Sequence, residues 1–289
     1  MNVLSAKSYE FELITPLIMT GAKKDKIEFR TQSIIGILRW WFRFYKACEV
    51  KDLKKLKEVE EETWGSQKKA KKFWMRIEKY PRETYLRVSD GTKGKRIIKR
   101  LAFKPENNTF SLSFKYVENF DKGSEVEKTI KFLSFFGGLG ARWRRGFSSV
   151  MWTEALFSGG NLDEIIDEIK KILELNTFRF VNNNDNNFDR FMNLRNTSIY
   201  LINPKNKFWN SWTDAMDSLR DKFYRPLKKM LGIKFGRTSP LVIQIKKSGD
   251  NNYFGVLLLW KLWKRFSECE YFIENCSRKR SFEIKRIKT

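Results

Sequence analysis

A glycine- and arginine-rich segment, FFGGLGARWRRGFSSV at residues 135–150, is the part of this 289-residue sequence best suited to binding chemistry. Glycine lets the backbone adopt positive φ and lets a ligand approach the main chain, and exposed amides in such a loop bind phosphate oxygens. Arginine adds bidentate phosphate contacts, and an indole ring offers a face on which a base can stack. The segment predicts a phosphate-binding loop whose candidate residues are Gly137, Gly138, Gly140, Arg142, Trp143, Arg144 and Arg145.

This loop matches none of the familiar nucleotide-binding or hydrolase motifs. No Gly-Lys-Ser/Thr follows it, and Trp143 stands where a dinucleotide fingerprint has a glycine. GFSSV also lacks the second glycine of a nucleophile elbow. The alternative interpretation is a basic hairpin or helix-to-strand turn without a function of its own.

A second candidate is the helix predicted over residues 32–47, within EFRTQSIIGILRWWFRFYKA. At about 100° per residue, its apolar side chains share one face, and the opposite face carries Gln32, Gly36, Arg39 and Arg43. A glycine inside a helix costs about 1 kcal/mol relative to alanine, so a neighbouring backbone or an RNA strand must approach that face. We expect Arg39 and Arg43 to hold adjacent phosphates. The alternative makes Gly36 a helix-packing contact and the arginines a solvated face.

The start of this helix is a natural anion site, because helix N-termini present unpaired amides and positive partial charge. Arg30, Thr31 and Ser33 lie there. A third segment, FGRTSPLVIQI at residues 235–245, places Arg237 and Ser239 before a predicted strand. They could contact RNA or a partner, and a simple turn is an equal alternative.

Several kinds of catalytic site are excluded by composition. Histidine is absent, which rules out histidine-based acid–base catalysis, Ser-His-Asp systems and His-ligated metals. The three cysteines, Cys48, Cys269 and Cys276, form no Cys-x-x-Cys pair, so neither a zinc site nor a disulfide scaffold is expected. The sequence predicts no cofactor and no metal.

The net charge of +24 is high enough to need a physical explanation, such as an anionic binding partner. The excess of Lys and Arg is spread over both halves of the chain, and aromatic residues make up 15% of it. A positive field over a folded domain attracts polyanions, so nucleic acid is the leading partner. A lysine-rich solvated surface is the alternative. With no signal peptide and no apolar run longer than Val256–Trp260, we expect a cytoplasmic protein without a membrane association.

The first half predicts strand, helix, strand, strand, helix, strand. The strands are expected at 8–19, 82–90, 109–117 and 147–157, and the second helix at 125–136. The charged segment 51–79 is interpreted as exposed helix and 93–103 as a basic connection. That order is the ferredoxin-like unit, whose sheet face is a common RNA-binding platform.

The second half is expected to begin at a boundary marked by SGGNLDE, with a helix starting near Leu162. NNNDNN at 182–187 is interpreted as a polar loop, 208–231 as helix, and 239–247, a stretch starting at 251 and 282–288 as strands. The predicted fold class is α+β, with two ferredoxin-like domains in tandem at residues 1–158 and 159–289, the second degenerate with extra helices.

The combination of these motifs resembles the RAMP superfamily of CRISPR-associated proteins, and within it the family of first subunits of type III-B Cmr effector complexes. That family carries an Arg-x-x-Ser-x-x-Gly-x-Leu-Arg helix and a Gly-Gly-x-Gly-Ala-Arg-x-Arg-Arg-Gly-Phe loop. The matching residues here are Arg30, Ser33, Gly36, Leu38 and Arg39, followed by the segment 137–147. The resemblance implies a binding subunit near the 3′ part of the guide RNA, beside other RAMP subunits, with target cleavage left to another subunit.

Three functions are therefore weighed. The leading hypothesis is a non-catalytic subunit that grips the guide RNA or the guide–target duplex through phosphate contacts, leaving sequence readout to base pairing. It requires the loop to lie outside the hydrophobic interior and its arginines to be free of acidic partners. The second is a metal-independent endoribonuclease that processes guide precursors, with Tyr9, Lys7 or Asp90 as the available bases. The third is an architectural protein whose basic surface meets acidic subunits.

Overall fold

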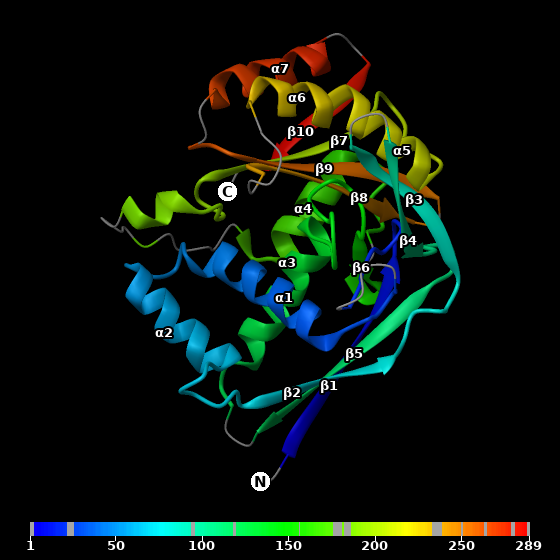
Figure 1. The fold of residues 1–289 in the computed structure, drawn as a ribbon. Helices are drawn as coiled ribbons and strands as arrows, with labels where there is room; N and C mark the ends of the chain where they lie inside the picture. The colour runs from blue at the N-terminus through cyan, green and yellow to red at the C-terminus, as the bar shows by residue number, and fades with distance from the viewer. Residues whose placement is uncertain are drawn as a thin grey trace. The chain divides into compact units, whose positions relative to one another are not determined.

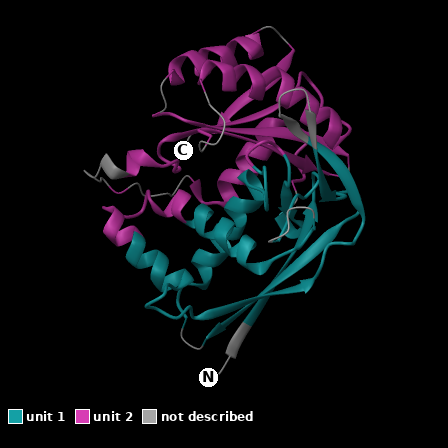
Figure 2. Cartoon of the chain, in the orientation of Figure 1, with its two compact units in different colours: residues 1–42, 57–143, 147–155 teal, residues 43–56, 144–146, 156–289 magenta. Residues whose placement is uncertain are grey.

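The structure is a computed structural model (Figure 1). It describes residues 3–21, 26–93, 96–117, 120–155, 157–175, 181, 186–232, 239–249, 251–262, 265–278 and 281–287, without the side chains of 3–5, 90–93, 96–98 and 186–187. The chain divides into two compact units, coloured separately in Figure 2. Unit 1 comprises residues 1–42, 57–143 and 147–155, and unit 2 comprises residues 43–56, 144–146 and 156–289.

Unit 1 is built on a four-stranded antiparallel sheet in the order β2-β5-β1-β6. Its strands are β1 (Val3–Leu13), β2 (Phe73–Lys79), β5 (Thr109–Val117) and β6 (Val150–Trp152), and the short 3-10 helix η1 (Thr153–Ala155) follows the last of them. The helices are α1 (Thr31–Lys46), α2 (Leu53–Trp64) and α3 (Gly123–Phe136); the last residues of α1 and the first of α2 are assigned to unit 2. In Figure 1, α1 and α3 lie on the same side of this sheet.

The core of unit 1 is aromatic because alternate positions of the central strands all point toward the helices. Tyr9 and Phe11 of β1 are fully buried, and so are Phe110 and Phe114 of β5. The Tyr9 and Phe114 rings meet edge to face at 5.7 Å, and Phe11 stacks on Phe110 at 5.1 Å. Burying such rings is the main stabilising contribution of this sheet.

A separate two-stranded sheet is inserted between β2 and β5. It is the hairpin of β3 (Tyr85–Lys93) and β4 (Arg96–Phe103), paired from Tyr85 with Phe103 to Lys93 with Arg96. A small cluster of Ile18, Val88 and Ala102, with Phe147 against it, anchors the base of the hairpin.

Unit 2 contains a second four-stranded antiparallel sheet, in the order β10-β7-β9-β8. Its strands are β7 (Thr197–Pro204), β8 (Leu241–Ser248), β9 (Asn252–Trp260) and β10 (Phe282–Ile287). The helices are α4 (Leu162–Ile172), α5 (Trp212–Leu219), α6 (Arg225–Met230) and α7 (Phe266–Arg278), with a 3-10 helix η3 (Asn186–Arg190).

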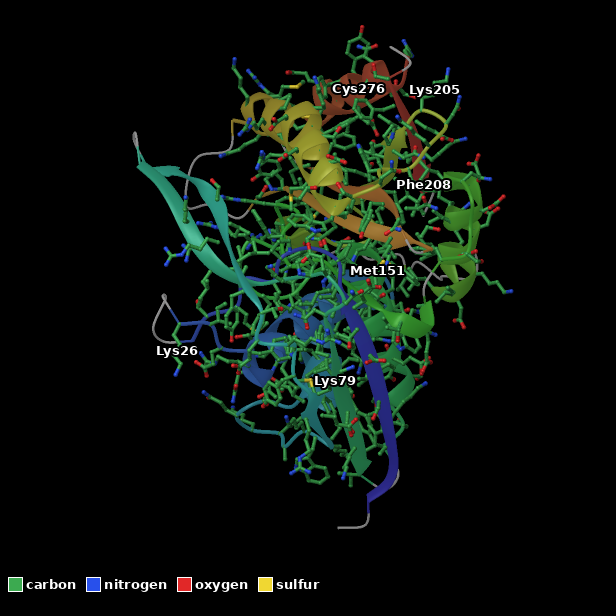
Figure 3. The ribbon with its side chains drawn as sticks, turned by 90° about the vertical axis from the view of Figure 1, so that its right-hand side faces the viewer. Lys26, Lys79, Met151, Lys205, Phe208 and Cys276 are labelled. Carbon is green, nitrogen blue, oxygen red and sulfur yellow. The ribbon has the colours of Figure 1, made fainter. Side chains whose placement is uncertain are left out.

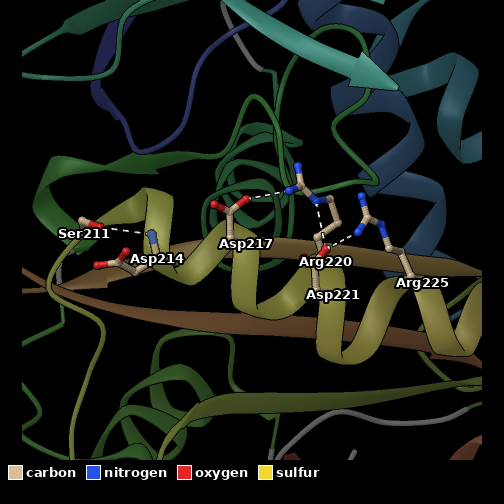
Figure 4. Close-up of polar contacts among 6 residues, drawn as sticks. All are labelled: Ser211, Asp214, Asp217, Arg220, Asp221 and Arg225. Atoms are coloured by element: carbon tan, nitrogen blue, oxygen red, sulfur yellow. Dashed lines mark hydrogen bonds and ion pairs between the residues drawn. The ribbon is translucent and has the colours of Figure 1, made fainter. Parts of the chain in front are cut away.

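The α5–α6 helix is continuous through a π-helical turn, η4 (Arg220–Tyr224), as Figure 4 shows. It starts where the Ser211 hydroxyl accepts a hydrogen bond from the Asp214 amide at 3.1 Å. Ion pairs then follow its exposed side, from Arg220 to Asp217 at 2.7 Å and from Arg225 to Asp221 at 2.8 Å. Such pairs one turn apart add a few tenths of a kcal/mol each.

Several sequence predictions are confirmed by these elements. The helices expected at 32–47, 125–136 and 208–231 and near Leu162 are α1, α3, the α5–α6 helix and α4. The strands expected at 109–117, 239–247, from 251 and at 282–288 are β5, β8, β9 and β10. Part of the polar loop, residues 182–185, lies outside the described residues.

Five assignments in the first half differ from the structure. The strand expected at 8–19 is β1, which begins at Val3 and already ends at Leu13. The segment 51–79 is not all exposed helix, because its end is the sheet strand β2. The strand expected at 82–90 is β3, which belongs to the hairpin and not to the four-stranded sheet. The segment 93–103, expected to be a connection, contains the second strand of that hairpin, β4. The final strand is only Val150–Trp152, since the backbone before it follows an irregular path. In unit 2, β7 and α7 were not anticipated.

Candidate nucleic-acid interface

The exposed face of α1 is the first part of the candidate interface, and Gly36 marks it. A Cβ built on Gly36 meets no other described atom within 4 Å, and Gln32 one turn earlier is exposed. The helix-packing interpretation of Gly36 is therefore wrong within the described residues. The glycine leaves an open patch of backbone on a helix whose opposite face is buried through Ile34, Leu38 and Trp41.

Arg39 lies on the same face, but it is not the free cation that the sequence suggested. Its Nε donates to Oε1 of Glu60 at 2.7 Å, and its Nη1 donates to the Gly65 carbonyl at 3.2 Å. The Arg39 side chain keeps 31% of its exposure, while that of Glu60 keeps 8%. Since a guanidinium has five N–H donors, three remain for another acceptor, and the contacts with Glu60 and Gly65 fix where they point.

Glu60 is the residue that the sequence analysis missed. It belongs to the acidic run of α2, which was interpreted as a solvated helix face, yet it is 6% exposed. Helical spacing indicates this burial, because Glu60 follows Leu56 by one turn and lies on the same buried side of the helix.

The start of α1 brings Arg30 and Ser33 near Gly36 along one helix. Arg30 lies just before the first helical residue, and its carbonyl accepts the Ile34 amide at 3.2 Å. Its guanidinium is 3.5 Å from Glu28, with 36% of the side chain exposed. No acidic residue occupies the first turn, so the positive end of the helix dipole is not neutralised there by its own side chains.

The glycine-rich loop serves packing. A Cβ on Gly137 would fall on the indole of Trp41, and one on Gly140 would fall on the Ile18 carbonyl. Gly140 also has a φ of +73°, which favours glycine. Gly137 and Gly138 are buried, and Gly138 forms a β-bridge with Ser149.

Three amides of this loop are paired within the fold, which contradicts the prediction that its main-chain donors form a bare phosphate cradle. The Gly137 amide donates to Leu133 at 2.8 Å, Leu139 to Ser148 at 2.8 Å, and Ala141 to Ile18 at 2.7 Å. Each acceptor is a carbonyl oxygen of unit 1 itself. Donors already paired in the fold offer nothing to a phosphate without breaking those bonds.

Trp143 is also not a stacking surface. It is 7% exposed, and its ring lies 5.2 Å from that of Trp40 and 5.8 Å from that of Trp41. The three indoles pack against one another, so Trp143 has no free ring face for a base. Arg142 next to it is half-buried, with a φ of +63°.

The remaining candidates belong to unit 2. Arg144 donates from Nη1 to the Ser239 carbonyl at 3.0 Å, and burial lowers its pKa to about 10. Arg145 is bridged through its backbone to Ile243 of β8, and its side chain is half-buried, as is that of Arg43 in the last turn of α1. Arg144 thus supports the fold, whereas Arg237 lies outside the described residues.

The groups weighed for catalysis lie in unsuitable surroundings. Tyr9 is fully buried, and burial is the largest of the effects that raise its pKa. The ammonium of Lys7 is held by Glu127 at 2.6 Å, and the side chain of Asp90 lies outside the described residues. Burial raises the pKa of the Cys48 thiol to about 12, so it is protonated at neutral pH.

No group of three or more cysteine, aspartate or glutamate side chains in the described part of the chain could hold a metal ion. No helix there is long and apolar enough to cross a membrane.

Comparison with known proteins finds a family and a set of relatives. Residues 10–150 match the RAMP superfamily. Over 71 residues the chain is 38% identical to the CRISPR system Cmr subunit Cmr1-2 of Pyrococcus furiosus, a match that spans 24% of this chain and 38% of that protein. It is 24% identical to Cmr1-1 of the same organism, over 86% of this chain and 85% of that one.

Solved structures have the same fold. The crystal structure of apo Cmr1 from Pyrococcus furiosus matches with a TM-score of 0.64 at 17% identity, covering 98% of this chain and 99% of that one. A chain in a cryo-EM structure of the type III-B Cmr-beta complex, bound to cognate target RNA and AMPPnP, matches with a TM-score of 0.58 at 13% identity, covering 96% and 100%.

Proposed function

This chain resembles the Cmr1 subunits and matches the RAMP superfamily over residues 10–150, and from this we propose that it is an RNA-binding subunit of a type III-B CRISPR complex. A relative that matches over most of this chain is named as a CRISPR system Cmr subunit. This chain also shares its fold with a chain of a Cmr complex that is bound to target RNA. Both observations support the proposal. Its RNA ligand is the guide RNA, in its 3′ region or as the guide–target duplex. Its protein partners are other RAMP subunits.

Both units are ferredoxin-like in this proposal. Numbering the strands of each sheet by chain order gives 2-3-1-4 from one edge to the other in unit 1 and 4-1-3-2 in unit 2, which are the same arrangement. The elements follow as strand, helix, strand, strand, helix, strand in unit 1 once α2 and the β3–β4 hairpin are set aside, and in unit 2 once the leading helices α4 and η3 are set aside.

The open backbone at Gly36 is the observation that carries RNA binding. A helix keeps an exposed glycine at a cost of about 1 kcal/mol, which a close approach by a ligand would explain. Arg39 lies one turn further on, with unused N–H groups held in place by Glu60. The contact is with the ribose–phosphate backbone, because base pairing between guide and target supplies the sequence readout.

We expect no catalysis from this subunit. Tyr9 and Lys7, two of the bases weighed for an endoribonuclease, are buried or paired. Incubation of the purified protein with repeat-containing RNA tests this directly. Specific cleavage that is lost on a single substitution would establish the endoribonuclease instead.

The test of the binding site is Gly36→Leu. Leucine has high helix propensity, and a Cβ at this position meets no described atom within 4 Å, so we expect the variant to be at least as stable as the parent. Its bulk keeps a phosphodiester chain away from the helix, so affinity for a fluorescein-labelled 20-nucleotide RNA should fall about tenfold, measured by fluorescence anisotropy.

Ser124→Leu is the matched control, since Ser124 is an exposed residue at the start of α3 in the same unit. It places the same leucine side chain away from the α1 face and should leave affinity unchanged. Equal affinities for the parent and Gly36→Leu would remove α1 from the interface. RNA affinity weaker than micromolar at physiological salt would favour the architectural role.

A further inference from the structure

The sheet of unit 1 has a second face, which looks away from α1 and α3. Side chains on a strand alternate between the two faces, so the residues opposite the aromatic core can be assigned from register. On β2 they are Trp74, Arg76 and Glu78, and on β5 they are Ser111, Ser113 and Lys115. On β1 they include Ser8 and Glu10, and we call the whole set the outer sheet face.

Trp74 is the anomaly on this face. It is 41% exposed on β2, an edge strand, while its neighbours Phe73 and Met75 are buried. Lys115 is its direct partner across the β5 pairing, and Arg76 is the next outward residue on its own strand. An exposed indole between two cations is a surface on which a base can stack while its phosphates are neutralised.

The charges on the outer sheet face are divided between its two ends. At the end of β2 away from Trp74, Glu10 accepts from Lys79, labelled in Figure 3, at 2.7 Å, and Glu78 accepts from Ser8 at 2.8 Å. Among the described residues, neither Arg76 nor Lys115 has a carboxylate within ion-pair distance. The carboxylates are thus engaged at one end, and the cations beside Trp74 at the other end remain available to an anion.

A buried hydroxyl lies within the same group. Ser113, which pairs with Arg76 on one side and Ser8 on the other, is 1% exposed. Its Oγ has no hydrogen-bond partner among the described residues. A buried polar atom without a partner costs about 1–3 kcal/mol, and the sheet carries this cost where Ser113 is flanked by Arg76 and Ser8.

We propose that Trp74, Arg76 and Lys115 form a second RNA contact on the outer sheet face, which binds an unpaired nucleotide by stacking on the indole and by phosphate contacts with the two cations. This inference rests on the proposed function and extends it from the backbone of a duplex to a single-stranded segment. Stacking needs an unpaired base, so the site discriminates single strands from duplexes, whereas phosphate contacts alone do not.

The chemistry favours RNA over a protein at this site. A protein docked over Trp74 would bury two cations without partners of their own, unless it supplied carboxylates. Each nucleotide of an RNA strand supplies an aromatic base and a phosphate anion. These groups match one indole ring flanked by two cations. A protein partner is therefore an outcome of the test.

The test compares Trp74→Ala, Trp74→Phe and the double variant Arg76→Gln, Lys115→Gln in the full chain. The probes are a fluorescein-labelled 12-nucleotide single-stranded RNA and the same strand annealed to its complement. We expect Trp74→Ala to lower single-strand affinity about tenfold, Trp74→Phe to restore most of it, and the duplex affinity to stay unchanged. The double variant should weaken both probes and flatten their salt dependence.

Matched controls come from unit 2. Tyr271→Ala removes an aromatic ring that is 63% exposed on α7, and Lys171→Gln removes an exposed cation from the end of α4. Both should bind like the parent. Circular dichroism melts of all variants confirm that the fold is retained.

The outcomes separate this inference from the function on which it rests. If Gly36→Leu weakens binding and Trp74→Ala does not, the second contact is overturned and the proposed function stands. If neither variant changes affinity, the second contact is overturned and α1 is removed from the interface as well, whereas parent affinity weaker than micromolar would overturn the function itself. If Trp74→Ala binds RNA normally but no longer co-purifies with sibling subunits, the outer sheet face is a protein-docking surface and the inference is overturned.

Discussion

At the scale of single residues, the glycines of this chain divide into two kinds that the sequence does not distinguish. Gly36 stands over open space on a helix, whereas Gly137 stands against the indole of a fully buried tryptophan, Trp41. The same residue type therefore marks an accessible surface in one place and a tightly filled interior in the other.

Substitution by alanine should give opposite results at these two positions. Gly137 has a φ of −118°, which any residue adopts, so the effect of Gly137→Ala is steric alone, and we expect a loss of about 1–3 kcal/mol. Gly36→Ala should gain about 0.5–1 kcal/mol through helix propensity. Urea unfolding monitored by circular dichroism measures both, and a stable Gly137→Ala variant would contradict the packing described for the loop.

Arginines show the same ambiguity at this scale. Charge and position suggested phosphate ligands at Arg39 and Arg144, yet the first is held by Glu60 and the second by a backbone carbonyl. Guanidinium groups satisfy internal acceptors as readily as external ones, and a sequence does not tell which acceptor is nearer.

At the scale of elements, β1 and α3 of unit 1 are joined by an ion pair with a pH dependence of known sign. Burial alone would raise the pKa of Glu127, but hydrogen bonds from Lys7 at 2.6 Å and from Lys131 outweigh it and lower the pKa below the ordinary value of 4.5. A lowered carboxyl pKa contributes stability above the unfolded-state pKa, and this contribution is lost as pH falls through the folded-state pKa.

Glu127→Gln should therefore destabilise the protein by about 0.5–1 kcal/mol at pH 7, and the difference should shrink toward zero as pH falls from about 5 to 3. Thermal melts at half-unit pH steps measure it. Lys7→Met removes the main partner and should reproduce most of the effect. A difference that stays constant across this range would show that Glu127 acts through packing instead of charge.

Elements with clean periodicity were predictable from sequence, and elements without it were not. The helices α1 and α3 and the strand β5 each show one apolar face, so their positions followed from pattern. β7 is buried at nearly every position, and a strand buried on both faces shows no alternation. β2 was hidden by the lysines before it, and its sheet position depends on pairing with β5, which is distant in sequence.

The binding site was predictable only in part, for a related reason. The open face of α1 follows from helical geometry, which is local. Whether a loop amide is free depends on carbonyls such as those of Ile18 and Ser148, which tertiary folding brings to the loop. Glycine content therefore signalled close approach correctly, but the approaching group is protein.

At the scale of the whole molecule, the net charge of +24 governs association with RNA. Neutralising phosphates releases counterions, so the logarithm of affinity falls linearly with the logarithm of salt concentration. A contact with about five phosphates of a single strand gives a slope of about −3.5, or roughly a hundredfold loss between 50 and 200 mM salt.

Fluorescence anisotropy titrations at four salt concentrations measure that slope. Gly36→Leu should lower the affinity and also make the slope less steep, by about 0.7 for each phosphate that the leucine keeps away from α1. The double variant Arg76→Gln, Lys115→Gln should make the slope less steep by about 1.4. A parent slope near zero would assign the positive charge to another role, such as contact with acidic subunits.

The two four-stranded sheets share a strand order, but the connections from the last helix to the last strand differ in length. Between α3 and β6 there are thirteen residues, 137–149, and they hold the glycine-rich loop, whereas α7 ends at Arg278 and β10 begins at Phe282. A connection of the first length has room for a substitution to be absorbed or an insertion to be added without moving the strand that follows it.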